Sequence, residues 1–351
     1  MAVYIIASSM VSAQKTLGGI FLPDEFECAE NGCLRIIEPI YKDYLPPAML
    51  RRMSRIVKFS LVSAFDCLAH LQDFSPEVVI TASSFGCIDD TGVFLIQMHE
   101  NEERLLNPTA FIRSTHNAVG GQIALLKNLH VANLTHSQKQ ASFETALIDG
   151  ILMLEVGEVE TALIGGFDEQ TELSINLHKQ IGCLSEVQIT REALLTGMNK
   201  TITPGEGAGF FVLSNQSSSL ANAELLGVEI LSCANTDLVT VTSDFLSKFQ
   251  LNDTDIDLLI PGIDGTPATK ELLKLMNSKF ETSTVAGFRH LSGCFGTDST
   301  FALWLANYAV LNANVGESAC LRGEAKRMFK KVLVINYIGN NSWSFMLLSK
   351  C

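Results

Sequence analysis

Short apolar runs alternate along the chain with longer amphipathic stretches. Several of the short runs are apolar at nearly every position, which is typical of strands buried on both faces of a sheet. The pattern predicts six strands, at residues 3–8, 77–82, 160–165, 209–213, 256–261 and 332–337.

The stretches between these runs carry apolar residues near helical spacing. Residues 53–71 and 142–156 are the clearest cases, and the second is followed by Gly157, a residue favoured just after the last turn of a helix. A third helix is predicted over residues 301–311, with an alanine- and leucine-rich face. Strands that alternate with helices indicate an α/β protein whose sheets are covered on both sides.

The one break in composition is the polar tract NQSSS at residues 215–219, and a new strand-like run starts at Glu224. The tract is either a flexible linker or a surface turn between two halves that pack into one unit. We favour the turn, and expect an N-terminal half at 1–215 and a C-terminal half at 216–351. No repeat of individual residues relates the two halves.

Composition sets limits on the function. The 351 residues are 47% apolar and 18% charged, so a large core can be buried and disorder is disfavoured. The formal net charge is -13 and no long basic run is present, which argues against nucleic acid as the main partner.

Nine cysteines are scattered along the chain, without a CxxC pair or a His/Cys cluster at zinc spacing. This favours a reducing compartment with free thiols, and nothing suggests a metal or other cofactor. The first residues, MAVYII, predict a strand rather than a signal peptide, and no apolar run reaches the about 18 residues of a membrane span. We therefore expect a cytoplasmic protein without a membrane span.

Three segments, taken together and in order, resemble the beta-ketoacyl synthase family. They are the basic RRMSR at residues 51–55 with its helical continuation, GEVETALIGG at 157–166, and PGEGAG at 204–209 followed by a strand. Each is weak alone, since glycines in turns are common. The set implies the thiolase-like αβαβα layered fold, built from two similar halves.

The resemblance also implies a cysteine nucleophile at the start of a buried helix, where the helix dipole and backbone N–H groups would activate it. Counting back from Gly165 by the family's spacing reaches Gln140. No cysteine lies between Cys87 and Cys183, so a small shift of the alignment does not supply one. The condensing nucleophile is missing from the sequence.

The two histidines that polarise a malonyl thioester in the family are also replaced. Their positions correspond to Gly262 and Cys294, and Arg289 takes the place of the family's lysine. His290 lies four residues too early for the second role. The closing G-F-G-G loop corresponds to residues 338–342, which include Asn340 and keep one glycine.

Chain-length-factor subunits and some decarboxylating loading domains resemble ketosynthases with glutamine in place of the cysteine. The decarboxylating kind still needs histidine donors, so the non-catalytic subunit is favoured. The resemblance then implies pairing with an active ketosynthase, or a homodimer, and work with an acyl carrier protein in polyketide, polyene-like or fatty-acyl synthesis. Candidates to line a substrate tunnel are Phe85, Phe111, Phe143, Met153 and Asn340.

Two other classes stay open. One is an enzyme, either a malonyl-carrier decarboxylase or an acyl hydrolase that uses Cys294 with His290 as its base. The other is a stand-alone protein that binds acyl chains or carriers. The basic run from Lys326 to Lys331 is either a docking site for an acidic carrier or a solvated turn.

Overall fold

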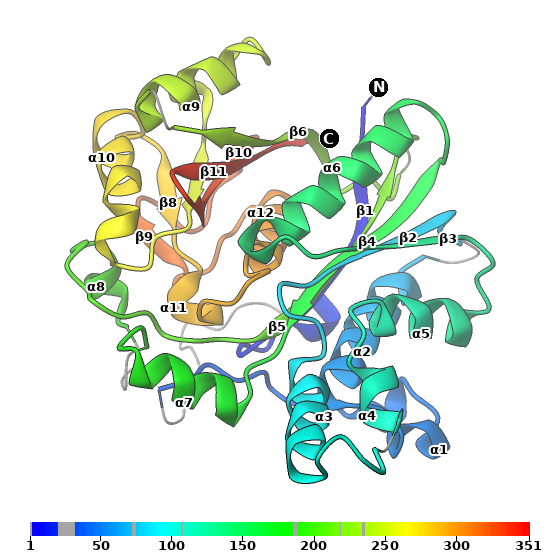
Figure 1. The fold of residues 1–351 in the computed structure, drawn as a ribbon. Helices are drawn as coiled ribbons and strands as arrows, with labels where there is room; N and C mark the ends of the chain where they lie inside the picture. Colours follow the sequence, from blue (N-terminus) through cyan, green and yellow to red (C-terminus); the bar gives the residue numbers. More distant parts are fainter. Residues whose placement is uncertain are drawn as a thin grey trace.

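The computed structural model describes residues 2–19, 32–71, 75–106, 108–184, 189–217, 219–233 and 236–351. Figure 1 shows strands that cross the middle of the molecule, with helices between them and on both outer sides. None of the helices in these ranges is long and apolar enough to cross a membrane. The described residues leave out Cys28, residues 185–188 and Ser218, which belongs to the predicted turn.

The strands of the first half are β1 (Tyr4–Val11), β2 (Val78–Ala82), β3 (Ala132–His136), β4 (Thr161–Asp168) and β5 (Gly207–Ser214). They lie side by side in the order β3-β2-β4-β5-β1. β3, β2 and β4 are parallel, while β5 is antiparallel to both β4 and β1. β3 is therefore an edge strand.

The second half repeats this arrangement. Its strands lie in the order β6-β11-β10-β7-β8-β9, with β11 antiparallel to both neighbours and β10, β7 and β8 parallel. β1 and β6 meet over only two residue pairs, Tyr4 with Glu224 and Ile5 with Ala223. The strand bounds are β6 (Ala223–Ser232), β7 (Leu258–Pro261), β8 (Thr284–Ala286), β9 (Cys320–Arg322), β10 (Lys331–Gly339) and β11 (Ser342–Lys350). The boundary between residues 215 and 216 stays a prediction.

The helices form three layers around these strands. α6 (Ser142–Glu155) and α12 (Ser299–Asn312) share one core cluster with strands of both halves. Outside them, α2 (Arg55–Ala69) and α5 (Ala118–Lys127) pack on the first half, while α9 (Leu238–Ser247) and α10 (Lys270–Ser278) pack on the second. The predicted thiolase-like αβαβα layers are confirmed, and α12 is buried almost all round because it lies in the middle layer.

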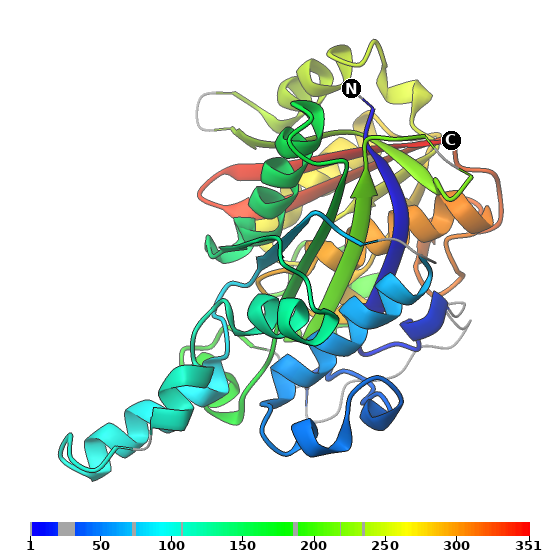
Figure 2. The same ribbon diagram turned by 90° about the vertical axis from the view of Figure 1, so that its right-hand side faces the viewer.

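The six predicted strands and three predicted helices are confirmed with small shifts at their ends. β3 was not predicted, because its sequence ANLTH contains a single large apolar residue and its outer positions face solvent. The remaining helices are α1 (Pro47–Leu50), α3 (Ile88–Glu100), α4 (Pro108–Arg113), α7 (Glu172–Gln180), α8 (Arg191–Leu194) and α11 (Arg289–Ser292). Figure 2 shows α3, in cyan, projecting from the body of the molecule.

Candidate functional site

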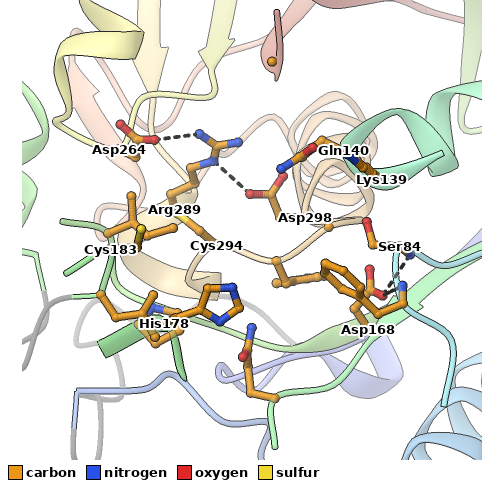
Figure 3. Close-up of a pocket in the computed structure, with 18 of the residues that line it drawn as sticks. Ser84, Lys139, Gln140, Asp168, His178, Cys183, Asp264, Arg289, Cys294 and Asp298 are labelled. Atoms are coloured by element: carbon orange, nitrogen blue, oxygen red, sulfur yellow. Dashed lines mark hydrogen bonds and ion pairs between the residues drawn. The ribbon is translucent and has the colours of Figure 1, made fainter. Parts of the chain in front are cut away.

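A cavity of about 350 Å³ lies where the two halves meet. Its wall comes from the loop after β2, the turn before α6, the end of β4, helix α7 and the loops around α11 and β10 (Figure 3). The cavity brings together three positions that the sequence predicted as a degenerate catalytic site, namely Gln140, Arg289 and Cys294.

Gln140 lies in a single 3-10 turn, Lys139–Ala141, directly before α6. Lys139 has a φ of 54°, so the chain turns sharply from β3 into the helix. The Ser142 hydroxyl stabilises this turn, since it accepts a hydrogen bond from the Gln138 amide at 2.8 Å and donates one to the Lys139 carbonyl at 2.6 Å. The turn places residue 140 at the cavity wall.

Arg289 is buried and has an acceptor for each of its three guanidinium nitrogens. Nε donates to Asp298 at 2.8 Å, and Nη2 donates to the Asn336 side chain at 2.9 Å. Nη1 donates to the Gly262 carbonyl at 2.9 Å and lies 3.3 Å from the Asp264 carboxylate. Figure 3 shows the two ion pairs. Four of the five N–H groups of the guanidinium are thus paired within the protein.

Gly262 lies behind this network and has no room for a side chain. A Cβ added there would lie 2.1 Å from Asn336 Oδ1, the same atom that accepts from Arg289. A histidine at residue 262 would therefore have to displace Asn336 and break one contact of the guanidinium.

Cys294 is held at the cavity by a contact between two glycines. The backbone of Gly293, with a φ of 70°, lies against Gly205 of the PGEGAG segment, where a Cβ would meet Ser292 O at 2.0 Å. This close approach lets the Cys294 amide donate to Thr203 O at 2.8 Å, while Cys294 O accepts from the Gly205 amide at 3.0 Å. The glycine-rich segment at residues 204–209 thus positions Cys294 at the cavity wall.

His290, the base of the hydrolase interpretation, does not lie at the cavity wall with the Cys294 thiol. Burial raises the pKa of the thiol well above its usual range, which keeps it protonated at neutral pH. His290 is fully buried outside the cavity wall, and its Nε2 lies 2.8 Å from the Ser318 carbonyl. Burial lowers the pKa of His290 to about 4.

The loop at residues 338–342 forms a tight hairpin turn between β10 and β11. Gly339, Asn340 and Asn341 have φ values of 91°, 50° and 54°, and Gly339 pairs with Ser342. Consecutive residues with positive φ are typical of the short turns that join antiparallel strands. Gly339 lines the cavity, while Asn340 lies at the tip of the hairpin outside the wall.

Of the aromatic and methionine side chains predicted to line a tunnel, Phe85 lies in the cavity wall. Phe143 lies instead in the central core, 5.7 Å from the Phe211 ring between centroids, and Met153 packs against the same core. Phe111 is on α4 and 56% exposed, away from the cavity of its own chain. Burial within the middle layer, rather than a tunnel, accounts for Phe143 and Met153.

The cavity residues that were not predicted from the sequence include Asp168, Glu169 and His178. The two acids follow the glycine pair after one residue, Phe167, at the end of β4, which is a position where side chains meet at a sheet edge. Burial raises the pKa of Asp168 to about 6 and that of Glu169 to about 8. An acidic pair after the family's glycines was the signal that could have identified them.

The basic run from Lys326 to Lys331 is partly bound within the chain. Arg327 pairs with Asp257 at 3.2 Å, and the same carboxylate accepts from the backbone amides of Lys330 and Lys331. Asp257 thus neutralises part of the run and shapes the turn before β10.

Comparisons with known proteins agree with this architecture. Residues 35–180 match the family model described as beta-ketoacyl synthase, N-terminal domain. The solved ishigamide ketosynthase/chain length factor superposes with a TM-score of 0.80 at 17% identity, covering 100% of this chain and 99% of that chain. A beta-ketoacyl synthase from Burkholderia phymatum gives 0.79 at 13% identity, with 100% and 99% covered. The ketosynthase ApeO in complex with its chain length factor ApeC, from Xenorhabdus doucetiae, gives 0.76 at 14%, with 100% and 98% covered.

A search of curated proteins with the sequence finds no match. The structural likeness nevertheless defines the class: the whole chain has the thiolase-like fold of the ketosynthases. Residues 35–180 are related to the N-terminal domain of the beta-ketoacyl synthases, which confirms the family resemblance drawn from the sequence.

Proposed function

We propose that this chain is a non-catalytic, chain-length-factor-like subunit that pairs with an active beta-ketoacyl synthase in polyketide, polyene or fatty-acyl chain elongation. The observation that carries the proposal is the closed network around Arg289. In the family, histidines polarise a thioester carbonyl at this place. Here we infer that their positions are taken by a glycine with no room for a side chain and a protonated thiol, beside a guanidinium with an acceptor for each nitrogen.

The surface beside Gln140 supports pairing. β3 ends the sheet, so one side of its backbone has no neighbouring strand within the described residues. Leu134 on β3 is exposed, and so is Leu125 on α5, a helix that contacts β3. Phe111 and Ile112 on α4, earlier in the chain, are exposed as well. An uncovered edge flanked by apolar groups favours association. We expect a total buried area well over about 2,000 Å² in the complex.

A partner would also explain why Phe111 is exposed on its own chain, since α4 belongs to the projecting part seen in Figure 2. An acyl carrier protein remains the proposed source of acyl groups for the pair. The partly neutralised run at Lys326 to Lys331 gives only modest support for carrier docking there.

The enzymatic alternatives receive less support. A malonyl decarboxylase needs donors to the thioester carbonyl. The one histidine among the described residues of the wall, His178 on α7, lies below Cys294 in Figure 3, and its Nδ1 lies 2.7 Å from the Ser174 carbonyl. A hydrolase needs an activated thiol, whereas burial keeps the thiol of Cys294 protonated and His290, the predicted base, lies outside the cavity wall.

The test is co-expression with a candidate ketosynthase that retains its cysteine, followed by size-exclusion chromatography with mass analysis. We expect a one-to-one heterodimer and a change in the product length of the partner. Leu134→Lys should weaken the complex, whereas Leu311→Lys, an exposed leucine at the end of α12, should not. A monomer that leaves the partner's rate and products unchanged would remove the proposal, and a homodimer would restrict it to self-pairing.

A further inference from the structure

A groove of about 260 Å³ lies among α2, α4 and α5, which Figure 1 shows grouped at the lower right, and it shares no described residue with the cavity between the halves. Two arginines line it: Arg52, in the loop before α2, and Arg113, the last residue of α4. The other described residues of the wall are neutral, and Met53, Val57 and Ile112 give it an apolar side. In a chain of net charge -13, this groove is a local reversal of sign.

Both arginines offer surface and charge to a ligand. Arg52 is exposed and Arg113 is half-buried, and no hydrogen bond or ion pair joins either side chain to a described residue. The acid that Arg113 affects is Asp90 on α3, whose pKa it lowers without coming within ion-pair distance. Arg55, the next cation along the chain, is bound to Glu206 instead. The two guanidinium groups of the groove therefore keep unused donors.

Two helices also begin at this groove. α2 starts after Ser54 and α5 after Asn117, and neither of these side chains accepts a hydrogen bond from the helix that it precedes. The Ser54 hydroxyl interacts with Asp90 instead, and neither helix has an acid in its first turn. The first amides of both helices therefore add partial positive charge to the site that the arginines define.

These features select the chemistry of a ligand. Arginine forms paired hydrogen bonds with phosphate and carboxylate groups. Two arginines together with two helix ends suit a doubly charged anion better than a singly charged one, because each contact gains from the second charge. The apolar side of the groove suits a small hydrocarbon substituent beside the anion.

The geometry points to a binding site for a small phosphate monoester, with the phosphate held by Arg52 and Arg113 and its substituent against Met53 and Val57. The negative charge of the whole protein disfavours non-specific binding of such an anion, so the contacts of the groove have to supply the affinity. Of the apolar residues named above for pairing, Ile112 lies in this wall, and Leu134, Leu125 and Phe111 do not. Ligand binding to the isolated chain therefore tests the site separately from pairing.

The test uses three probes that share an aromatic ring and carry two, one and no negative charges: phenyl phosphate, benzoate and benzyl alcohol. Binding to the whole protein is followed by saturation-transfer NMR titration at pH 7.5, where a phosphate monoester with a second pKa of about 6 is largely doubly charged. We expect phenyl phosphate to bind about tenfold more tightly than benzoate, and benzoate more tightly than benzyl alcohol. The affinity for phenyl phosphate should fall as salt is added, because the arginines are accessible to solvent.

Arg52→Gln and Arg113→Gln each remove one charge from the groove and no described contact within the chain, so both should keep the Tm of the parent. Each should weaken phenyl phosphate about tenfold and leave benzyl alcohol unaffected. Arg104→Gln is the matched control, since this exposed arginine lies between α3 and α4 outside the groove, and it should change neither affinity.

Three results would each overturn the inference. The first is equal binding of phenyl phosphate and benzyl alcohol, and the second is tighter binding of benzoate than of phenyl phosphate. The third is a loss of affinity in Arg104→Gln as large as that in Arg52→Gln and Arg113→Gln, since the effect would then come from net charge and not from this groove.

Discussion

At one end of the cavity each nitrogen of the Arg289 guanidinium has an acceptor, whereas at the other end Asp168 keeps one buried oxygen without a donor. Both groups lie in a poorly solvated interior, where an unpaired charge is costly. At the first end the buried charge is compensated by two carboxylates and two neutral acceptors. At the second end desolvation raises the pKa of Asp168 to about 6 without a cation to offset it. The difference separates a compensated buried charge from an uncompensated one.

Breaking the paired end should have the largest effect. Arg289→Met would leave Asp298 and Asp264 buried without their cation, and we expect a loss of about 3–5 kcal/mol in the free energy of unfolding. Urea denaturation measures the loss. Lys274→Met, which breaks an exposed pair with Glu271, should cost less than about 1 kcal/mol. Equal losses in the two variants would show that the network is not a buried ion pair.

A smaller change at the same end tests how tightly the network is packed. Gly262→Ala places a methyl group against Asn336 Oδ1 and should cost about 1–3 kcal/mol, measured as a lower Tm. Gly121→Ala in α5 meets nothing within 4 Å and should be neutral or slightly stabilising. If Gly262→Ala melts like Gly121→Ala, the histidine position is less constrained than the structure indicates.

At the unpaired end, removing the charge should stabilise the protein. The pKa of Asp168 is about 6 in the folded state against 3.8 for the ordinary group, so its ionisation opposes folding as the pH rises between these values. Asp168→Asn should therefore gain about 2–3 kcal/mol at pH 8 and little near pH 4. Urea denaturation across this range measures the gain. Asp244→Asn, on the exposed face of α9, should show no such rise, and a gain independent of pH would contradict the assigned pKa.

The smallest expected effect concerns catalysis. Gln140→Cys should give no condensation, because the donors at Gly262 and Cys294 would still be missing. The parent protein should form no acyl adduct with acyl-carrier or acyl-CoA donors, as checked by intact-mass spectrometry. A stable adduct on Cys294 would favour the hydrolase interpretation, and condensation by Gln140→Cys would show that the paired end is not the obstacle.

Much of the fold was predictable because buried strands and helices leave periodic patterns that do not depend on their neighbours. The six apolar runs that became β1, β2, β4, β5, β7 and β10 were found in this way, and so were α2, α6 and α12. β3 was not, because an edge strand with polar and exposed positions has no apolar run to reveal it. The tunnel candidates show a similar limit: a large apolar residue such as Phe143 looks the same in sequence whether it faces a cavity or the core.

The sequence by itself determined the order of the elements and the family resemblance, and it predicts that the cysteine and both histidines are replaced. Only the tertiary structure decided what the replacements do. Arg289 reaches Asp264 and Asn336, which are 25 and 47 residues away, and Asp168 reaches Ser84 over 84 residues. Such contacts depend on the order of the strands in the sheets and on which loops lie at the same edge of a sheet. Local patterns carry no information about either, so the paired and unpaired ends of the cavity appear only in three dimensions.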